Sequence, residues 1–243
     1  MLPAKKREKW QVENLPHELN YTPPPSLDNQ ASQPMNPTID FIYFDLGNVL
    51  ALFDHETGCQ QVSALTGVPI MQVREIIFGT GLDVQYETGK ISSRQFVDTF
   101  ADQSNTRPDT EEFLLAASNI FTLNREIVPL ITQLRAISFP MGILSNTCEA
   151  HWNFLSHPRF AVINECFEKC ILSYESKSMK PDGKIYADAI ALAGVAPEQI
   201  LFVDDRQENV RGAIDAGLDA HLFTSVTEAV SYTHLTLPTI LLV

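Results

Sequence analysis

The feature that most constrains this chain is a series of short apolar runs, several of which end at a polar residue. The clearest is "DFIYFD" (40–45), which is followed by the break "LGN". The others are "MGILSN" (141–146), "KCILS" (169–173), "ILFVDD" (200–205) and "AHLF" (220–223). Short, continuous, β-branched runs of this kind are typical of strands that are covered on both faces.

Helical patterns lie between these runs. Examples are "EIVPLITQLRAI", "KIYADAIALAGV" and "NVRGAIDAGL". Alternation of strand and helix predicts an α/β fold with a doubly wound, parallel, Rossmann-like sheet. Ligands of such sheets bind beyond the carboxyl ends of the strands, which is where Asp45, Asn146 and Asp205 stand.

An insert without strand alternation separates the first two runs. Its segments "VREIIF" and "RQFVDTFA" have helical apolar spacing, and Ser92 with Gln95 forms a capping-box pattern. We therefore predict a core made of residues 39–55 and 126–229, with a small helical cap at 56–125 inserted after the first strand.

The two ends of the chain are not predicted to belong to the folded domain. Residues 1–38 are rich in Pro, Ser, Asn and Gln, which predicts a disordered tail, and Met35 is a candidate alternative start to Met1. The segment "VSYTHLTLPT" matches an in-frame reading of a transposase sequencing adapter, so we expect residues 230–243 to be an artefact. On that interpretation the native sequence ends near Ala229 and lacks a final helix.

Composition limits the partners. The 243 residues carry a formal net charge of −13, which disfavours nucleic acid and anionic lipid and requires a cation or a local positive pocket for any anionic substrate. No apolar run approaches the roughly 18 residues that span a bilayer. The four cysteines have neither zinc-ligand spacing nor disulfide density, which favours reduced thiols and a cytoplasmic location.

Four motifs in order give the strongest functional signal. They are "FDLGNVL" with Asp45, "LSNT" with Ser145 and Asn146, "KPD" with Lys180, and "VDD" with Asp204 and Asp205. Each is weak alone, because strand-ending acids and turn residues often serve as caps. Together, over about residues 40–229, the chain resembles a haloacid dehalogenase-superfamily hydrolase. Within that superfamily it is similar to the branch of glucose-1-phosphate phosphatase and the phosphatase domain of soluble epoxide hydrolase.

The resemblance implies a magnesium-dependent phosphatase of small phosphate monoesters, with sugar phosphates as one class, and a role for each motif residue. Asp45 would attack phosphorus to form an aspartyl-phosphate, and Lys180 would balance the charge. The implied ligands of Mg²⁺ are Asp45, the Gly47 carbonyl and Asp205. Asp204 completes the implied metal site beside these ligands, and Asn209 lies behind it. The implied phosphate-binding residues are Leu46, Gly47, Ser145, Asn146 and Lys180.

Gly47 departs from the pattern of most phosphatases of the superfamily, which carry an aspartate there as general acid. Such proton transfer contributes about 10²–10⁴-fold to the rate. Three outcomes are open: another group protonates the leaving oxygen, the enzyme prefers good leaving groups, or it binds phosphate with little turnover. In the cap, Tyr86 and Glu87 are candidate substrate contacts, although a plain turn between helices accounts for them too. Phe53 and His55, where the cap begins, could also touch substrate, with packing at the hinge as the alternative.

Two alternatives to the phosphatase remain. A 2-haloacid dehalogenase would use the same nucleophile without metal, but its pattern lacks the paired acids seen here as Asp204 and Asp205. A phosphate- or protein-binding pseudoenzyme is the third hypothesis, motivated by Gly47.

Overall fold

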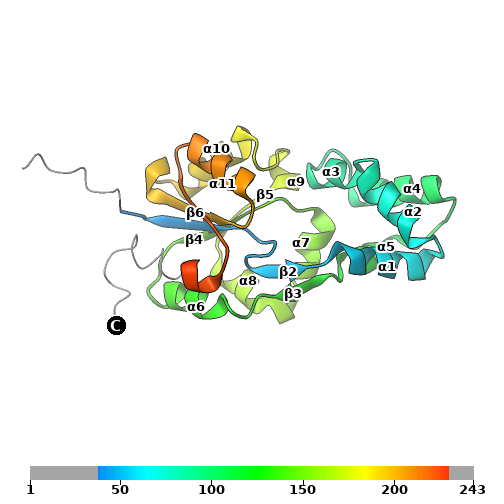
Figure 1. The fold of residues 1–243 in the computed structure, drawn as a ribbon, viewed down its shortest axis with the longest axis horizontal. Helices are drawn as coiled ribbons and strands as arrows, with labels where there is room; N and C mark the ends of the chain where they lie inside the picture. Colours follow the sequence, from blue (N-terminus) through cyan, green and yellow to red (C-terminus); the bar gives the residue numbers. More distant parts are fainter. Residues whose placement is uncertain (1–37, 230–243) are drawn as a thin grey trace, which may run out of the picture. The chain divides into compact units, whose positions relative to one another are not determined.

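A five-stranded sheet forms the centre of the structure, a computed structural model that describes residues 38–229, all within one unit that spans Asn36–Val243. Its strand order is β5-β4-β1-β6-β7, and every neighbouring pair is parallel. The strands are β1 (Phe41–Phe44), β4 (Met141–Ser145), β5 (Lys169–Leu172), β6 (Ile200–Asp204) and β7 (Asp219–Leu222). The predicted doubly wound parallel α/β fold is therefore confirmed (Figure 1).

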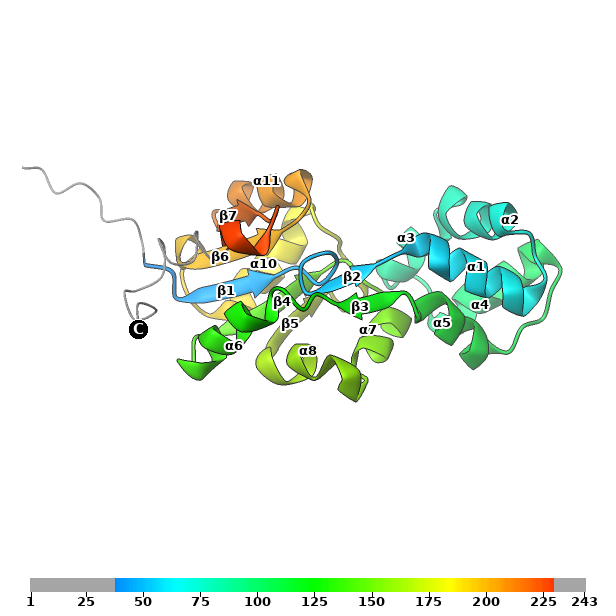
Figure 2. The same cartoon turned by 60° about the horizontal axis from the view of Figure 1, so that its bottom comes forward.

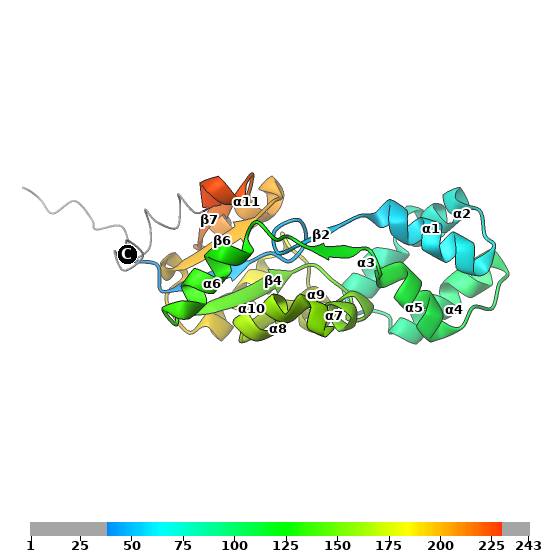
Figure 3. The ribbon, with the colours of Figure 1, turned by 90° about the horizontal axis from the view of Figure 1, so that it is seen from below.

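The central strand β1 is apolar throughout because helices cover both faces of the sheet. Ile42 and Phe44 belong to the core cluster on one face, which also holds residues of α6 (Val128–Ala136) and α8 (Ala161–Cys166). Phe41 and Tyr43 belong to the cluster on the other face. That second cluster includes residues of α10 (Gly183–Ala193) and α11 (Gln207–Asp215). Figure 3 shows α6 and α8 in front of the sheet.

The register of β1 against β6 sets the position of the acids. Phe44 pairs with Val203, and the Asp45 backbone N–H donates to the Val203 carbonyl at 2.8 Å. Asp45 and Asp204 therefore leave adjacent parallel strands at the same sheet edge, as the sequence predicts.

A second group of helices lies between β2 and β3 in the chain and forms its own apolar cluster (Figure 2). These helices are α1 (His55–Thr66), α2 (Ile70–Arg74), the π-helical turn η1 (Glu75–Gly79), α3 (Leu82–Glu87), α4 (Ser93–Ser104) and α5 (Thr110–Ser118). The Ser92–Gln95 capping box is present at the start of α4. We refer to these helices as the cap.

The base of the cap corrects the description of the insert as free of strands. β2 (Ala51–Phe53) and β3 (Phe121–Leu123) pair in antiparallel fashion into a two-stranded ribbon. Three-residue strands give too little alternation for a sequence pattern to reveal them. The predicted boundaries of core and cap, 55/56 and 125/126, stay a prediction.

Shorter elements complete the chain: α7 (Glu149–Leu155), η2 (Pro158–Phe160), α9 (Ser173–Ser176) and η3 (Pro197–Gln199). Within residues 38–229, none of the helices has the length and apolar character that a membrane span requires. The predicted tail (but for residue 38) and the adapter-like segment 230–243 lie outside the described residues.

Candidate active site

Asp45 follows β1 directly and is almost fully buried, at 7% exposure. Its Oδ1 accepts a hydrogen bond from the Leu46 N–H at 2.7 Å and lies 2.8 Å from Nζ of Lys180. Oδ2 accepts no hydrogen bond from the part of the chain that the structure describes. One carboxylate oxygen is thus held in place while the other is available. Burial raises the pKa of Asp45, and Lys180 opposes that shift.

Lys180 is the positive charge at this edge of the sheet. Its Nζ lies 2.8 Å from Asp45, 2.6 Å from Asp204 and 2.9 Å from the Leu144 carbonyl, so each of its three protons has an acceptor. Burial alone would lower the pKa of Lys180, but the two carboxylates outweigh it and raise that pKa.

Asp204 is fully buried and saturated with donors. Oδ2 accepts from Lys180 and Asn209, and Oδ1 accepts from Asn209 and from the Arg206 N–H at 2.8 Å. A carboxylate offers about four lone-pair sites, so Asp204 has none left for a ligand. Its position orients Lys180.

Asp205 is only partly buried and differs from its neighbour. Its Oδ2 accepts from the side-chain amide of Asn48 at 3.0 Å. Asn48 adopts a left-handed backbone with φ of 55°, a conformation that asparagine tolerates better than most residues. The left-handed turn after β1 therefore places the Asn48 amide against Asp205.

Three carboxylates meet here, since Asp45, Asp204 and Asp205 each offer an oxygen within 4.8 Å of the others. Carboxylate oxygens are the ligands that Mg²⁺ prefers. Asp45 and Asp205 have oxygens free for a cation, whereas Asp204 is engaged. The donor set fits a divalent cation between Asp45 and Asp205.

The loop after β4 carries the "LSNT" motif. The Asn146 side chain accepts from the Lys180 N–H at 2.8 Å and donates to the Lys180 carbonyl at 3.0 Å. Both ends of this amide therefore hold the backbone of Lys180 in place. Ser145 is buried and lines a small cavity of about 60 Å³ together with Gly47 and Glu87.

A larger cavity of about 290 Å³, which we call the site cavity, opens beside Asp45 between sheet edge and cap. Its lining residues are Asp45, Gly47, Asn48, Phe53, His55, Phe78, Asp83, Val84, Glu87, Asn146, Met179, Lys180, Asp205, Arg206 and Asn209.

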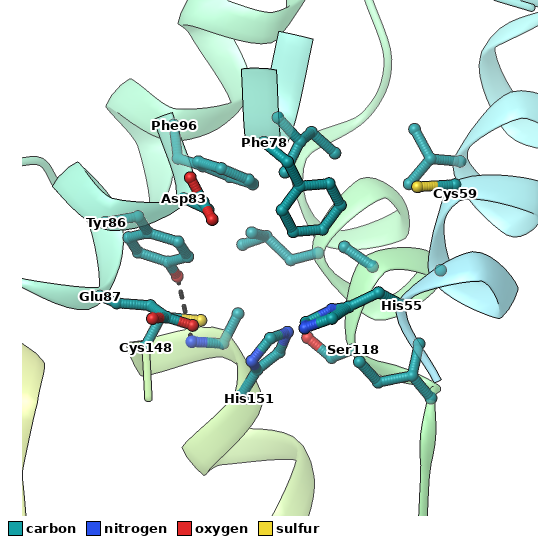
Figure 4. A pocket seen from close by; sticks show the side chains of 17 residues that line it. His55, Cys59, Phe78, Asp83, Tyr86, Glu87, Phe96, Ser118, Cys148 and His151 are labelled. Carbon is teal, nitrogen blue, oxygen red and sulfur yellow. Dashed lines mark hydrogen bonds between the residues drawn. The ribbon is translucent and has the colours of Figure 1, made fainter. Parts of the chain in front are cut away.

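A pocket of about 50 Å³ adjoins it between the cap helices and the start of α7, and we call it the cap pocket (Figure 4). Glu87 of α3, His151 of α7 and His55 of α1 turn their polar ends into it from three elements (Figure 4). Burial raises the pKa of Glu87 to about 7. Burial, assisted by His55, lowers the pKa of His151 to about 4, so this imidazole is neutral near pH 7.

Comparison with known families settles the relationship. A family model described as haloacid dehalogenase-like hydrolase matches residues 39–217. The chain belongs to the haloacid dehalogenase-like hydrolase family. The resemblance stated from the four motifs is confirmed.

Proteins with known names or solved structures are similar over most of the chain. D-ribitol-5-phosphate phosphatase of Bacteroides thetaiotaomicron is 27% identical over 186 residues, which cover 73% of this chain and 88% of that protein. A solved family enzyme from the same organism, in complex with magnesium and inorganic phosphate, superposes with a TM-score of 0.67 and 25% identity, covering 76% and 93% of the two chains. L-2-haloacid dehalogenase from Xanthobacter autotrophicus shares the fold, with a TM-score of 0.55, 18% identity and coverage of 81% and 82%.

The structure brings the sequence-predicted residues of this hydrolase to one sheet edge, with contacts that the motifs alone do not specify. The Leu46 N–H is engaged by Asp45, and the Asn146 amide by Lys180. Asn48 and Arg206 are site residues that motif reasoning missed. The Gly47-Asn48 pair after the first apolar run, which indicates a turn, was the available sequence signal for Asn48.

Proposed function

We propose that this hydrolase is a magnesium-dependent phosphatase that cleaves small phosphate monoesters through an aspartyl-phosphate on Asp45. The observation that carries the proposal is the position of Lys180, buried between Asp45 at 2.8 Å and Asp204 at 2.6 Å, beside the partly buried Asp205. The phosphatase name of the B. thetaiotaomicron relative and the magnesium and phosphate in the similar structure support it.

Each residue has a distinct part in the proposed reaction. Asp45 would attack phosphorus through one carboxylate oxygen and would keep the other for the cation, and Lys180 and the Leu46 N–H orient this carboxylate. Lys180 keeps one positive charge beside the nucleophile, and Asp204 keeps Lys180 in place. Water would then cleave the aspartyl-phosphate.

Mg²⁺, held by Asp45, Asp205 and the Gly47 carbonyl, would supply positive charge to the phosphoryl oxygens when bound. Ser145 lines the small cavity next to Gly47, where it would contact a phosphate oxygen.

The lining of the site cavity favours a small, uncharged leaving group. On the cap side it presents Phe53, Phe78 and Val84 together with the acids Asp83 and Glu87. A second anionic group on the leaving alcohol would be repelled there, which favours monoesters of small alcohols, sugar phosphates among them. A cytoplasmic location accords with the four free cysteines.

A phosphate-binding protein with little turnover is the second candidate, favoured by the absence of a carboxyl group at residue 47. The 2-haloacid dehalogenase alternative is weaker, because its chemistry has no use for the carboxylate cluster of Asp45 and Asp205.

One assay separates these functions. Phosphate release from a generic aryl phosphate is measured with Mg²⁺, with chelator, and with Asp45→Asn. Release that requires Mg²⁺ and is lost in Asp45→Asn supports the phosphatase. Binding of phosphate by the folded protein without release would favour the second candidate.

A further inference from the structure

The proposed function lacks one component at residue 47, a proton donor for the departing oxygen. Alkoxides are poor leaving groups, so hydrolysis of an alkyl phosphate needs an acid within hydrogen-bond reach. The following inference rests on the proposed function and concerns the source of that proton.

Residue 47 has no side chain, and the place where one would begin is crowded. A Cβ built on Gly47 would lie 2.8 Å from Cε1 of Phe53, a distance at which something must shift. The phenyl ring of Phe53 therefore crowds the point at which a side chain on residue 47 would begin. Phe53 thus packs against Gly47, and the proton donor for the leaving oxygen has to be a side chain elsewhere in the site cavity.

The ionisable groups of the site cavity divide by location. At the sheet edge lie Asp45, Lys180 and Asp205, which are committed to the nucleophile and the cation. Arg206 lies at this edge too, directly after Asp205, whereas His55, Asp83 and Glu87 belong to the cap.

Two of these four groups, Arg206 and His55, are poor proton donors. Arg206 is ion-paired with Glu208, which raises its pKa further from neutrality. Burial lowers the pKa of His55, so near neutral pH it is a neutral imidazole with no readily released proton. The two carboxyl groups on α3 remain.

Glu87 reaches further into the site than Asp83. Both line the site cavity and the cap pocket, but only Glu87 also lines the small cavity with Gly47 and Ser145. Figure 4 shows Asp83 one turn earlier on the helix, away from the Glu87 carboxyl group. Glu87 is thus the acid next to the position that a side chain on residue 47 would face.

The backbone of Glu87 is anchored to the phosphate-binding side of the site. Its carbonyl accepts from the Ser173 hydroxyl at 2.7 Å, and the same Oγ accepts from the Thr147 N–H at 2.9 Å. One residue earlier, the Tyr86 hydroxyl accepts from the Ala150 N–H at 3.0 Å. These hydrogen bonds join the end of α3 to the loop after β4. They therefore hold Glu87 at a fixed position relative to the sheet edge that carries Asp45.

The surroundings of Glu87 keep a proton on it. The ionisable groups that face it are Asp83 on α3, Asp45 after β1, Arg206 before α11, Cys148 and His151 at the start of α7, and His55 on α1. Within residues 38–229 no salt bridge involves Glu87. Burial, followed by the charge of Asp83, raises the pKa of Glu87 to about 7.

We propose that Glu87 is the general acid that protonates the leaving oxygen, in place of the side chain absent at Gly47. When the Asp45 carboxylate attacks, the bond from phosphorus to the ester oxygen breaks, and its electron pair takes the carboxyl proton of Glu87. The alcohol departs, leaving the aspartyl-phosphate and the Glu87 carboxylate. The carboxylate then accepts a proton from the water that attacks phosphorus, which releases phosphate and restores both side chains.

The test compares two leaving groups on the full chain. 4-Nitrophenyl phosphate departs without needing a proton, whereas a simple alkyl phosphate such as glycerol 3-phosphate needs one. Glu87→Gln is predicted to lower kcat on the alkyl ester by about 10²–10⁴-fold. The fold-loss on the aryl ester should be smaller than that by a factor of about ten or more. Residual aryl ester turnover shows that the variant is folded, and Glu87→Asp is expected to recover part of the alkyl ester rate.

Asp98→Asn is the control, since it removes an exposed acid of the cap that lines neither the site cavity nor the cap pocket. It should leave both rates unchanged. Equal losses on the two esters in Glu87→Gln, no loss at all, or a selective loss in Asp98→Asn would overturn the assignment. Two results would contradict the proposed function itself: no phosphate release from either ester by the wild-type chain, or release by Asp45→Asn at the wild-type rate. Either result would also remove the basis for the role of Glu87.

Discussion

The ammonium group of Lys180 lies 2.6 Å from the carboxylate of Asp204, and both side chains are essentially excluded from solvent, at 1% and 0% exposure. Lys180→Met would leave Asp204 and Asp45 as buried charges without a counterion. Breaking a buried pair in this way costs about 3–5 kcal/mol. We expect a loss of that size in the free energy of unfolding, measured by urea denaturation.

The control for Lys180 is Lys184→Met, which removes the exposed salt bridge to Asp188. Exposed pairs contribute about 0–1 kcal/mol. Equal losses in the two variants would show that Lys180 and Asp204 do not form the buried pair described above.

Restoring a carboxyl group at residue 47 should fail unless Phe53 is also reduced. Gly47→Asp places a Cβ 2.8 Å from the Phe53 ring, so we expect lower stability and lower turnover of alkyl phosphates than in the wild type. Combining Gly47→Asp with Phe53→Ala provides the space. The double variant should therefore be more stable, and turn over alkyl phosphates faster, than Gly47→Asp alone. Identical behaviour of the single and double variants would contradict the steric explanation.

The site should bind Mg²⁺ in the absence of substrate. A ligand that binds only the folded state raises stability by roughly RT ln(1 + [L]/Kd). We therefore expect Mg²⁺ to raise the Tm of the wild-type chain in a concentration-dependent manner, and Asp205→Asn to remove most of that rise. Asp98→Asn, which alters an exposed acid of α4, should keep it. A Tm rise that survives in Asp205→Asn would place the cation elsewhere.

The pH dependence follows from the protonation state of Glu87. Its pKa is raised to about 7 by burial, so the acid form needed for proton donation is present below that value and is lost as the pH rises through it. The rate on an alkyl phosphate should accordingly fall above about pH 7, while the rate on 4-nitrophenyl phosphate falls much less. Glu87→Gln should abolish this alkaline limb. An unchanged limb in that variant would show that another group is responsible.

The sequence is sufficient to predict the sheet and the residues at its edge, because a continuous apolar run such as 41–44 has few other uses and places Asp45 where it ends. It does not predict that Phe53 packs beside Gly47, since that contact depends on the position and orientation of the ribbon formed by β2 and β3. The pairing of Asn48 with Asp205 joins residues far apart in the chain and carries no local signal beyond a turn.

Glu87 shows the same limit from the cap. The turn sequence that contains it suggests at most a substrate contact. The hydrogen bonds from Ser173 to the Glu87 carbonyl and from Ala150 to the Tyr86 hydroxyl hold the end of its helix beside the loop after β4. Specific tertiary contacts between core and cap decide such positions, and a single sequence does not reveal them.

The most direct test of the central claim is detection of the phosphoryl group on Asp45. The full chain is mixed with 4-nitrophenyl phosphate and Mg²⁺, quenched in acid within one turnover and digested, and the peptides are weighed by mass spectrometry. We predict that the peptide containing Asp45 gains the mass of one phosphoryl group, and that the gain is absent with chelator and in Asp45→Asn. Phosphate release at the wild-type rate by Asp45→Asn, with no labelled peptide in either protein, would contradict it.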